Sequence, residues 1–120
     1  MQTLIVDDEE DMRFLLRTTI QIANQGLEVA GEAADGFEAL RRWREDRPDC
    51  VVIDHRMPGV TGLDVCREIL TEDPHQSIVL FSAHLDDELR RAASALGVRA
   101  CLSKVDIHLL PETLWGIAAA

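Results

Sequence analysis

Five polar side chains suited to chemistry each follow closely after an apolar run: Asp7, Asp8, Asp54, Ser82 and Lys104. Each one alone has an ordinary structural explanation. Acidic residues favour the first turn of a helix, a serine hydroxyl bonds to nearby backbone, and a lysine usually faces solvent. If the fold brings them together, however, the three carboxylates repel one another. The set therefore indicates a site that needs cations.

Mg²⁺ is the cation that this set favours, because it prefers oxygen ligands, uses one or two carboxylates and keeps waters and phosphate oxygens as further ligands. With Lys104 it would balance the charge of the three carboxylates. A metal ion, an ammonium group and a hydroxyl can together hold a phosphoryl group. A carboxylate beside them can act as nucleophile and form an aspartyl phosphate. Asp54 follows a fully apolar run, so its charge would be costly unless it is paired.

The apolar runs themselves predict the strands that position these residues. Residues 3–6, 50–53 and 77–81 are almost continuously apolar, which is typical of central parallel strands covered on both faces. Residues 27–30 and 99–102 are weaker and suit edge strands. Five strands alternating with five helices predict an open α/β sandwich with right-handed crossovers. Polar sites in such sheets lie beyond the carboxyl ends of the strands, so the five side chains should meet at one edge.

Capping residues and helical spacing predict the intervening helices. Asp35, Thr61 and either Asp86 or Asp87 are candidate N-caps, and Gly97 suits a left-handed stop. Pro111 fits the first turn of a short last helix, which should finish at residues 118–120. The residues expected on the buried faces are Met12, Leu15, Leu16, Thr19 and Ala23; Phe37, Leu40 and Trp43; Leu63, Cys66, Ile69 and Leu70; and Leu114 and Ile117.

Composition limits the classes of function. A chain of 120 residues suits one domain, and its formal net charge of −10 argues against nucleic-acid binding by the domain itself. No apolar run is long enough for a membrane span, and the start lacks a signal peptide, so we expect no membrane contact. Cys50, Cys66 and Cys101 are odd in number and lack CxxC spacing. Buried free thiols in a reducing cytoplasm fit best.

Four segments resemble the receiver domain of two-component response regulators: residues 4–10, residues 52–59 with Gly62, residues 79–83 and residues 102–104. They occur in the order and spacing of that family and span nearly the whole chain. The resemblance implies a flavodoxin-like three-layer sandwich with a five-stranded parallel sheet of order 2-1-3-4-5 and five helices. It also implies one receiver domain over residues 1–120, with no output domain within it.

The resemblance assigns a role to each residue of the set. Asp54 corresponds to the phosphoacceptor, and Asp7 and Asp8 to the acidic pair that binds Mg²⁺ with it. The backbone carbonyl of Arg56 corresponds to the remaining protein ligand of the metal.

Three further positions correspond to contacts with the phosphoryl group. Ser82 occupies the position of the switch hydroxyl, the backbone amide of Ala83 faces the phosphoryl group, and Lys104 bridges to its oxygens. Arg56 and His84 stand where members of the family tune hydrolysis of the acyl phosphate.

Two positions depart from the family pattern. Cys101 replaces the aromatic residue that usually precedes the lysine by three positions, and Val105 replaces the proline that commonly follows it. A cis bond before valine would cost about 2.5–4 kcal/mol, so we expect a trans bond and a different path into the last helix. These departures affect downstream signalling more than the phosphorylation chemistry.

The implied function is a regulatory switch rather than an enzyme, although it assists its own phosphorylation and dephosphorylation. A sensor histidine kinase or phosphotransfer protein would phosphorylate Asp54. The change would reach the face formed by helix four, strand five and helix five, and control an output domain or partner, with transcription regulation as one candidate output. The same face is a candidate for homodimerisation.

Three other functions are alternatives to this interpretation. A receiver-like docking module without phosphorylation is the main alternative, favoured by Cys101 and Val105 but opposed by the complete acidic set. A Mg²⁺-dependent phosphatase would be expected to show Asp-x-Asp after the first strand and a cap domain. A nucleotide-binding protein would be expected to show GxGxxG or a P-loop after Val6.

Overall fold

The computed structural model describes residues 1–118, and these form one five-stranded parallel sheet with helices on both faces. The strands are β1 (Gln2–Val6), β2 (Glu28–Ala33), β3 (Cys50–Ile53), β4 (Ser77–Ser82) and β5 (Ala100–Ser103). The helices are α1 (Glu10–Ala23), α2 (Gly36–Asp46), α3 (Gly62–Glu72), α4 (Asp87–Leu96), the 3-10 helix η1 (Lys104–Leu109) and α5 (Leu110–Ala118). The expected end of the last helix at residues 119–120 lies outside the described residues.

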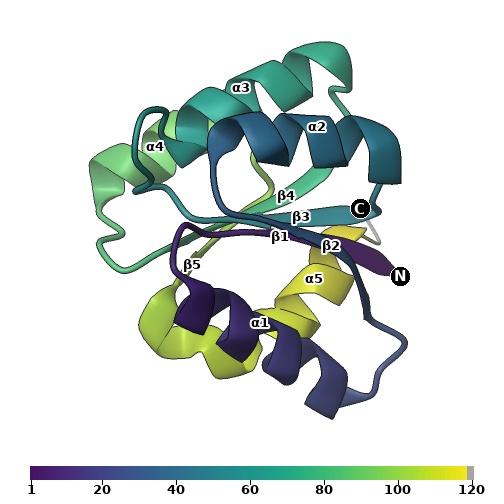
Figure 1. Cartoon of the computed structure of the whole chain (residues 1–120). Coiled ribbons are helices and arrows are strands. Elements are labelled where there is room, and N and C mark those ends of the chain that lie inside the picture. The colour runs from purple at the N-terminus through teal and green to yellow at the C-terminus, as the bar shows by residue number, and fades with distance from the viewer. Residues whose placement is uncertain (119–120) are drawn as a thin grey trace.

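The order of the strands in the sheet is β2-β1-β3-β4-β5, and every neighbouring pair is parallel. Helices α2, α3 and α4 cover one face, while α1 and α5 cover the other (Figure 1). The predicted flavodoxin-like sandwich is therefore confirmed. The three apolar runs are the central strands, as expected: β3 and β4 are buried along their whole length, and β1 along all but its first residue.

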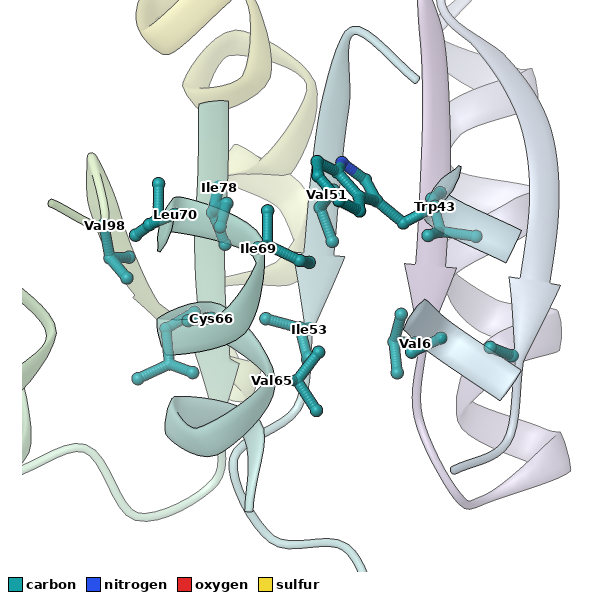
Figure 2. Close-up of a cluster of buried hydrophobic side chains, with 14 of the residues drawn as sticks. Val6, Trp43, Val51, Ile53, Val65, Cys66, Ile69, Leu70, Ile78 and Val98 are labelled. Atoms are coloured by element: carbon teal, nitrogen blue, oxygen red, sulfur yellow. The ribbon is translucent and has the colours of Figure 1, made fainter. Parts of the chain in front are cut away.

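Two apolar cores hold the sheet between its helical layers. The core beneath α2, α3 and α4 is shown in Figure 2, where Val51, Ile53 and Ile78 of the sheet face Val65 and Ile69 of α3. The opposite core joins the other faces of the same strands to α1 and α5; its largest buried side chains include Ile5, Leu16, Ile20, Phe81, Leu110 and Leu114. Each such side chain contributes about 1.5–3 kcal/mol when fully buried. The sheet is thus a firm base for the loops at its edge.

The helix starts agree with the predicted caps. The Asp35 carboxylate accepts a hydrogen bond from the Glu38 backbone amide at 2.9 Å, and Asp86 does the same for Leu89 at 2.8 Å. Thr61 begins α3 with a complete capping box. Each cap is typically worth about 1 kcal/mol.

The prediction that Leu15 and Phe37 are buried is wrong, because Leu15 is 44% exposed and Phe37 is 84% exposed. In α1 the buried stripe runs through Leu16 and Ile20, one turn apart, and Leu15 lies about 100° round the helix from Leu16. In α2 the buried face instead includes Ala39 and Trp43. The second strand also lies later than residues 27–30, because pairing with β1 continues to Ala33.

The three cysteines are free, as expected. Cys50 and Cys66 are fully buried, whereas Cys101 in edge strand β5 is only partly buried. Among residues 1–118, none of the helices has the length and apolar character of a membrane span.

Candidate functional site

The carboxyl ends of the strands bring the five polar residues to one edge of the sheet. Asp7 directly follows β1 and Asp54 directly follows β3, and these strands pair in register from Thr3–Cys50 to Val6–Ile53. The Asp54 backbone amide continues the ladder by donating to the Val6 carbonyl at 2.9 Å. Ser82 is the last residue of β4, and Lys104 directly follows β5. Residues far apart in the sequence are therefore neighbours because of the parallel register.

Asp7, Asp8 and Asp54 form a compact carboxylate cluster. Each offers one oxygen, and these three atoms lie within 4.8 Å of one another. Asp7 is fully buried and Asp54 is 3% exposed, while Asp8 faces solvent. Asp8 could instead have capped α1, but the N-cap residue is Glu9 and its side chain makes no capping bond. The capping explanation for Asp8 therefore fails.

Lys104 places its ammonium group against this cluster. Its Nζ donates to Asp7 Oδ2 at 3.0 Å and lies 3.4 Å from Asp54 Oδ1. Partial burial alone would lower the pKa of Lys104, but its bonds and charge interactions with Asp7 and Asp54 raise the pKa overall. The side chain therefore stays positively charged.

The charge of Asp54 is nevertheless disfavoured. Burial raises its pKa, the negative charge of Asp7 raises it further, and Lys104 only partly opposes them. One ammonium group does not neutralise two buried carboxylates. A small divalent cation would offset the remaining repulsion, and the three ligand atoms are the hard oxygens that Mg²⁺ prefers. The residues present therefore fit Mg²⁺.

Arg13 of α1 supports the cluster, and no sequence pattern predicted this role. Its guanidinium donates to the Asp7 backbone carbonyl at 2.8 Å, and its Nε lies 3.6 Å from Glu32 of β2. The Asp7 carboxylate also accepts from the Glu9 amide at 2.9 Å. Asp7 is thus held by its backbone and by its side chain. An arginine on a helix surface carries no signal that separates this role from solvation.

Ser82 is buried beside the cluster strands and is 1% exposed. Its Oγ accepts a hydrogen bond from the His84 backbone amide at 3.2 Å. Ala83 follows it and is exposed, as is Arg56 in the loop after β3. Arg56 and His84 line one hollow of about 320 Å³ on this side of the molecule, between the loops that follow β3 and β4.

Gly62 holds the loop after Asp54 in place. Its amide donates to the His55 carbonyl at 2.8 Å, so the loop closes on itself before α3 begins. A Cβ atom at residue 62 would overlap the Asp54 carbonyl oxygen. Only glycine allows the start of α3 to pack this closely against the Asp54 backbone.

The two departures from the family pattern lie next to this edge. Cys101 packs partly buried against the core beneath α3 and α4. Val105 is 83% exposed, and the Lys104–Val105 bond is trans, as predicted. The chain then enters α5 through the 3-10 helix η1.

The order of the sheet and its acidic edge define the class, a flavodoxin-like α/β domain with a candidate divalent-cation site. The chain matches the response regulator receiver domain over residues 3–113. It is 44% identical to the chemotaxis protein CheY of Thermotoga maritima over 82 residues, which cover 68% of this chain and 67% of that relative.

Solved structures agree. A two-component response regulator of the LuxR family from Aurantimonas sp. SI85-9A1 superposes with a TM-score of 0.91 and 32% identity, covering 98% of this chain and 84% of that one. Vibrio cholerae CheY4 gives a TM-score of 0.87 with 28% identity, covering 97% of both chains. The chain therefore belongs to the receiver domain family of two-component response regulators. Domains of this family are regulatory, and they interact with histidine kinases or phosphotransfer proteins.

Proposed function

We propose that the chain is a phosphorylation-controlled switch that accepts a phosphoryl group on Asp54 from a sensor histidine kinase or phosphotransfer protein. The observation that carries the proposal is the buried Asp54 carboxylate, which has Lys104 Nζ at 3.4 Å and two further carboxylates within 4.8 Å. A structural ion pair would not need three carboxylates around one ammonium group, because like charges at this separation repel.

Asp7, Asp8, Asp54 and the backbone carbonyl of Arg56 would hold Mg²⁺. When bound, the ion supplies positive charge that neutralises phosphoryl oxygens and screens the carboxylates from one another. This part of the proposal is supported by the mutual distances of the carboxylate oxygens and by the absence of histidine and cysteine from that cluster.

The residues of the chain divide the remaining work. A carboxylate oxygen of Asp54 attacks phosphorus, so an O–P bond forms as the P–N bond to the donor imidazole breaks and its electron pair stays on nitrogen. The Lys104 ammonium group stabilises the charge on the transferred oxygens. Among residues 1–118 the Ser82 Oγ accepts from the His84 amide and donates to no partner, so its hydrogen can donate to a phosphoryl oxygen. The Ala83 amide would donate to the same group.

We further propose that the change is passed to the face formed by α4, β5 and α5. Movement of Ser82 toward the new charge would shift the population of that face, which controls an output domain or partner and is a candidate dimer interface. Transcription regulation is one candidate output, and the proposed location is the cytoplasm. DNA contact by this domain is not proposed, because of its net charge of −10.

The test is labelling with acetyl phosphate in the presence of Mg²⁺, followed by intact mass measurement. The wild-type chain should gain one phosphoryl group, and Asp54→Asn or added chelator should abolish the gain. Asp87→Asn, an exposed aspartate of α4, is the matched control and should be labelled normally. Unchanged labelling of Asp54→Asn would assign the chemistry elsewhere. No labelling of the wild-type chain would favour the docking module.

A further inference from the structure

Phe37 is the most exposed large hydrophobic side chain of the described chain, at 84%. It stands in the first turn of α2, on a face that the core does not use. Burying a phenylalanine side chain contributes about 1.5–3 kcal/mol, so a partner that covered Phe37 would gain binding free energy of this size.

Phe37 borders a groove between α2 and α3, two helices that lie side by side on the same face of the sheet (Figure 1). The α2–α3 groove is lined by Phe37, Leu40, Val60, Asp64, Val65 and Glu68. Its volume is about 110 Å³. A water molecule takes about 30 Å³ of liquid, so the space suits roughly four non-hydrogen atoms, the size of a leucine side chain.

Gly36 also lines the groove, and it allows the start of α2 to lie close to Val60. A Cβ atom at this residue would overlap Val60, so the absence of a side chain lets the loop before α3 pack against the start of α2. The close approach of Val60 to Gly36 therefore helps to shape this groove.

The charged residues that line the groove are all acidic. Asp64 and Glu68 are its charged lining residues, and no Arg, Lys or His is among the lining residues within 1–118. Asp64 is already engaged, since its carboxylate accepts from the Thr61 amide at 3.1 Å and pairs with Arg67 at 3.2 Å. Glu68 forms no salt bridge within residues 1–118. Its exposed carboxylate can pair with a cationic partner, although its charge also helps to raise the pKa of Arg44 in α2.

We propose that the α2–α3 groove docks a positively charged, amphipathic segment of another protein. One apolar side chain of the segment would fill the groove against Phe37 and Leu40, and a neighbouring lysine or arginine would meet Glu68. The net charge of −10 on this chain favours a cationic partner over a second copy of itself, which would bring a like charge. The inference does not depend on phosphorylation of Asp54.

The test begins with random short peptides displayed on phage and selected on the immobilised full chain. The selected peptides should carry an aliphatic or aromatic residue flanked by lysine or arginine. The best of them, made synthetically with a fluorescent label, should bind with a dissociation constant that Phe37→Ala and Glu68→Lys each raise at least about tenfold. Both side chains are exposed, so both variants should fold, and urea unfolding midpoints close to that of the wild-type chain would confirm it.

Glu112→Lys is the matched control, because it makes the same change of charge at an exposed residue of α5. The Glu112→Lys variant should bind the peptide with a dissociation constant within about twofold of the wild-type value. A charge that does not touch the peptide acts on it only through a long-range electrostatic interaction, which salt screens. Selected peptides without basic residues, or affinities that ignore both groove variants, would overturn the proposal. So would sedimentation showing that the chain self-associates and that Phe37→Ala abolishes the association, because a second copy would then cover the groove.

Discussion

Replacing Asp54 by asparagine should stabilise the metal-free protein at pH 7. The Asp54 carboxylate is 3% exposed and lies within 4.8 Å of two other carboxylates, with Lys104 Nζ at 3.4 Å. At an effective dielectric constant of about 20, the attraction to Lys104 is worth roughly 5 kcal/mol and each of the two repulsions at least roughly 3.5 kcal/mol, so the repulsions at least offset the attraction. What remains is the cost of taking the carboxylate out of water. Since that cost is several kcal/mol for a buried ion, we expect Asp54→Asn to raise the free energy of unfolding by about 1–3 kcal/mol.

The increase in the free energy of unfolding caused by Asp54→Asn should become larger as pH rises. Burial and Asp7 raise the pKa of Asp54 in the folded state above its ordinary value of about 3.9. Below that ordinary value, both states hold the proton and the wild-type chain loses nothing. As pH rises from there through the raised folded pKa, the unfolded chain ionises first, so wild-type stability falls. The advantage of Asp54→Asn should therefore be small near pH 4, grow as pH rises and level off above the folded pKa.

Urea unfolding followed by tryptophan fluorescence measures this difference. Trp43 is buried, and its Nε1 donates to Gln76 at 2.8 Å, so its emission should change on unfolding. In thermal unfolding the same gain corresponds to roughly 4 °C per kcal/mol for a chain of this size. Mg²⁺ should stabilise the wild-type protein much more than the Asp54→Asn variant. It should therefore reduce the difference between their free energies of unfolding.

Glu68→Gln is the control for net charge, because it removes one exposed carboxylate in the middle of α3 and should change stability by less than about 0.5 kcal/mol. The reasoning is refuted if Asp54→Asn is no more stable than the wild-type protein without Mg²⁺ at pH 7. A gain of equal size at pH 4 and pH 7 would also refute it.

Three further predictions concern other residues. Burial raises the pKa of Cys66 to about 12 and that of Cys50 to about 11. A thiol reagent at pH 8 should therefore modify the partly exposed Cys101 first, and Cys50 and Cys66 only in denaturant. Peptide mapping would show which cysteines are modified. Lys104→Met should slow labelling of Asp54 by acetyl phosphate on the order of a hundredfold, measured by intact mass over time, because the transferred oxygens lose a cation; an unchanged rate would contradict its role. Gly62→Ala should cost about 1–3 kcal/mol in urea unfolding through overlap with the Asp54 backbone, whereas Gly116→Ala, which has free space, should not destabilise.

The central strands and the acidic edge were predictable because they depend on patterns that the sequence carries directly. Fully apolar runs such as 50–53 indicate strands covered on both faces, and parallel order then requires Asp7 and Asp54 to lie side by side. The caps at Asp35 and Thr61 were likewise predictable, because capping depends on residues three apart.

The remaining features depend on tertiary packing. Phe37 has the type of a core residue, but which side of α2 meets the sheet is decided by how β2 and α3 flank it. Arg13 supports Asp7 through a backbone carbonyl, which any residue has, so no side-chain pattern marks the contact. The length of β2 depended on its pairing with β1 beyond residue 30.

The contact between Gly62 and the Asp54 carbonyl restricts how the gene for this protein can vary in length. Residue 62 has to arrive at one point on the backbone, so an insertion or deletion between positions 54 and 62 would displace the first turn of α3. The turn after α1 differs, because Asn24, Gln25 and Gly26 are exposed and the hydrogen bond that Gly26 accepts from the Met1 ammonium group, at 2.6 Å, lies at the opposite end of β1 from Asp7. Codons added at that turn should be tolerated, whereas codons added in the Asp54 loop should not.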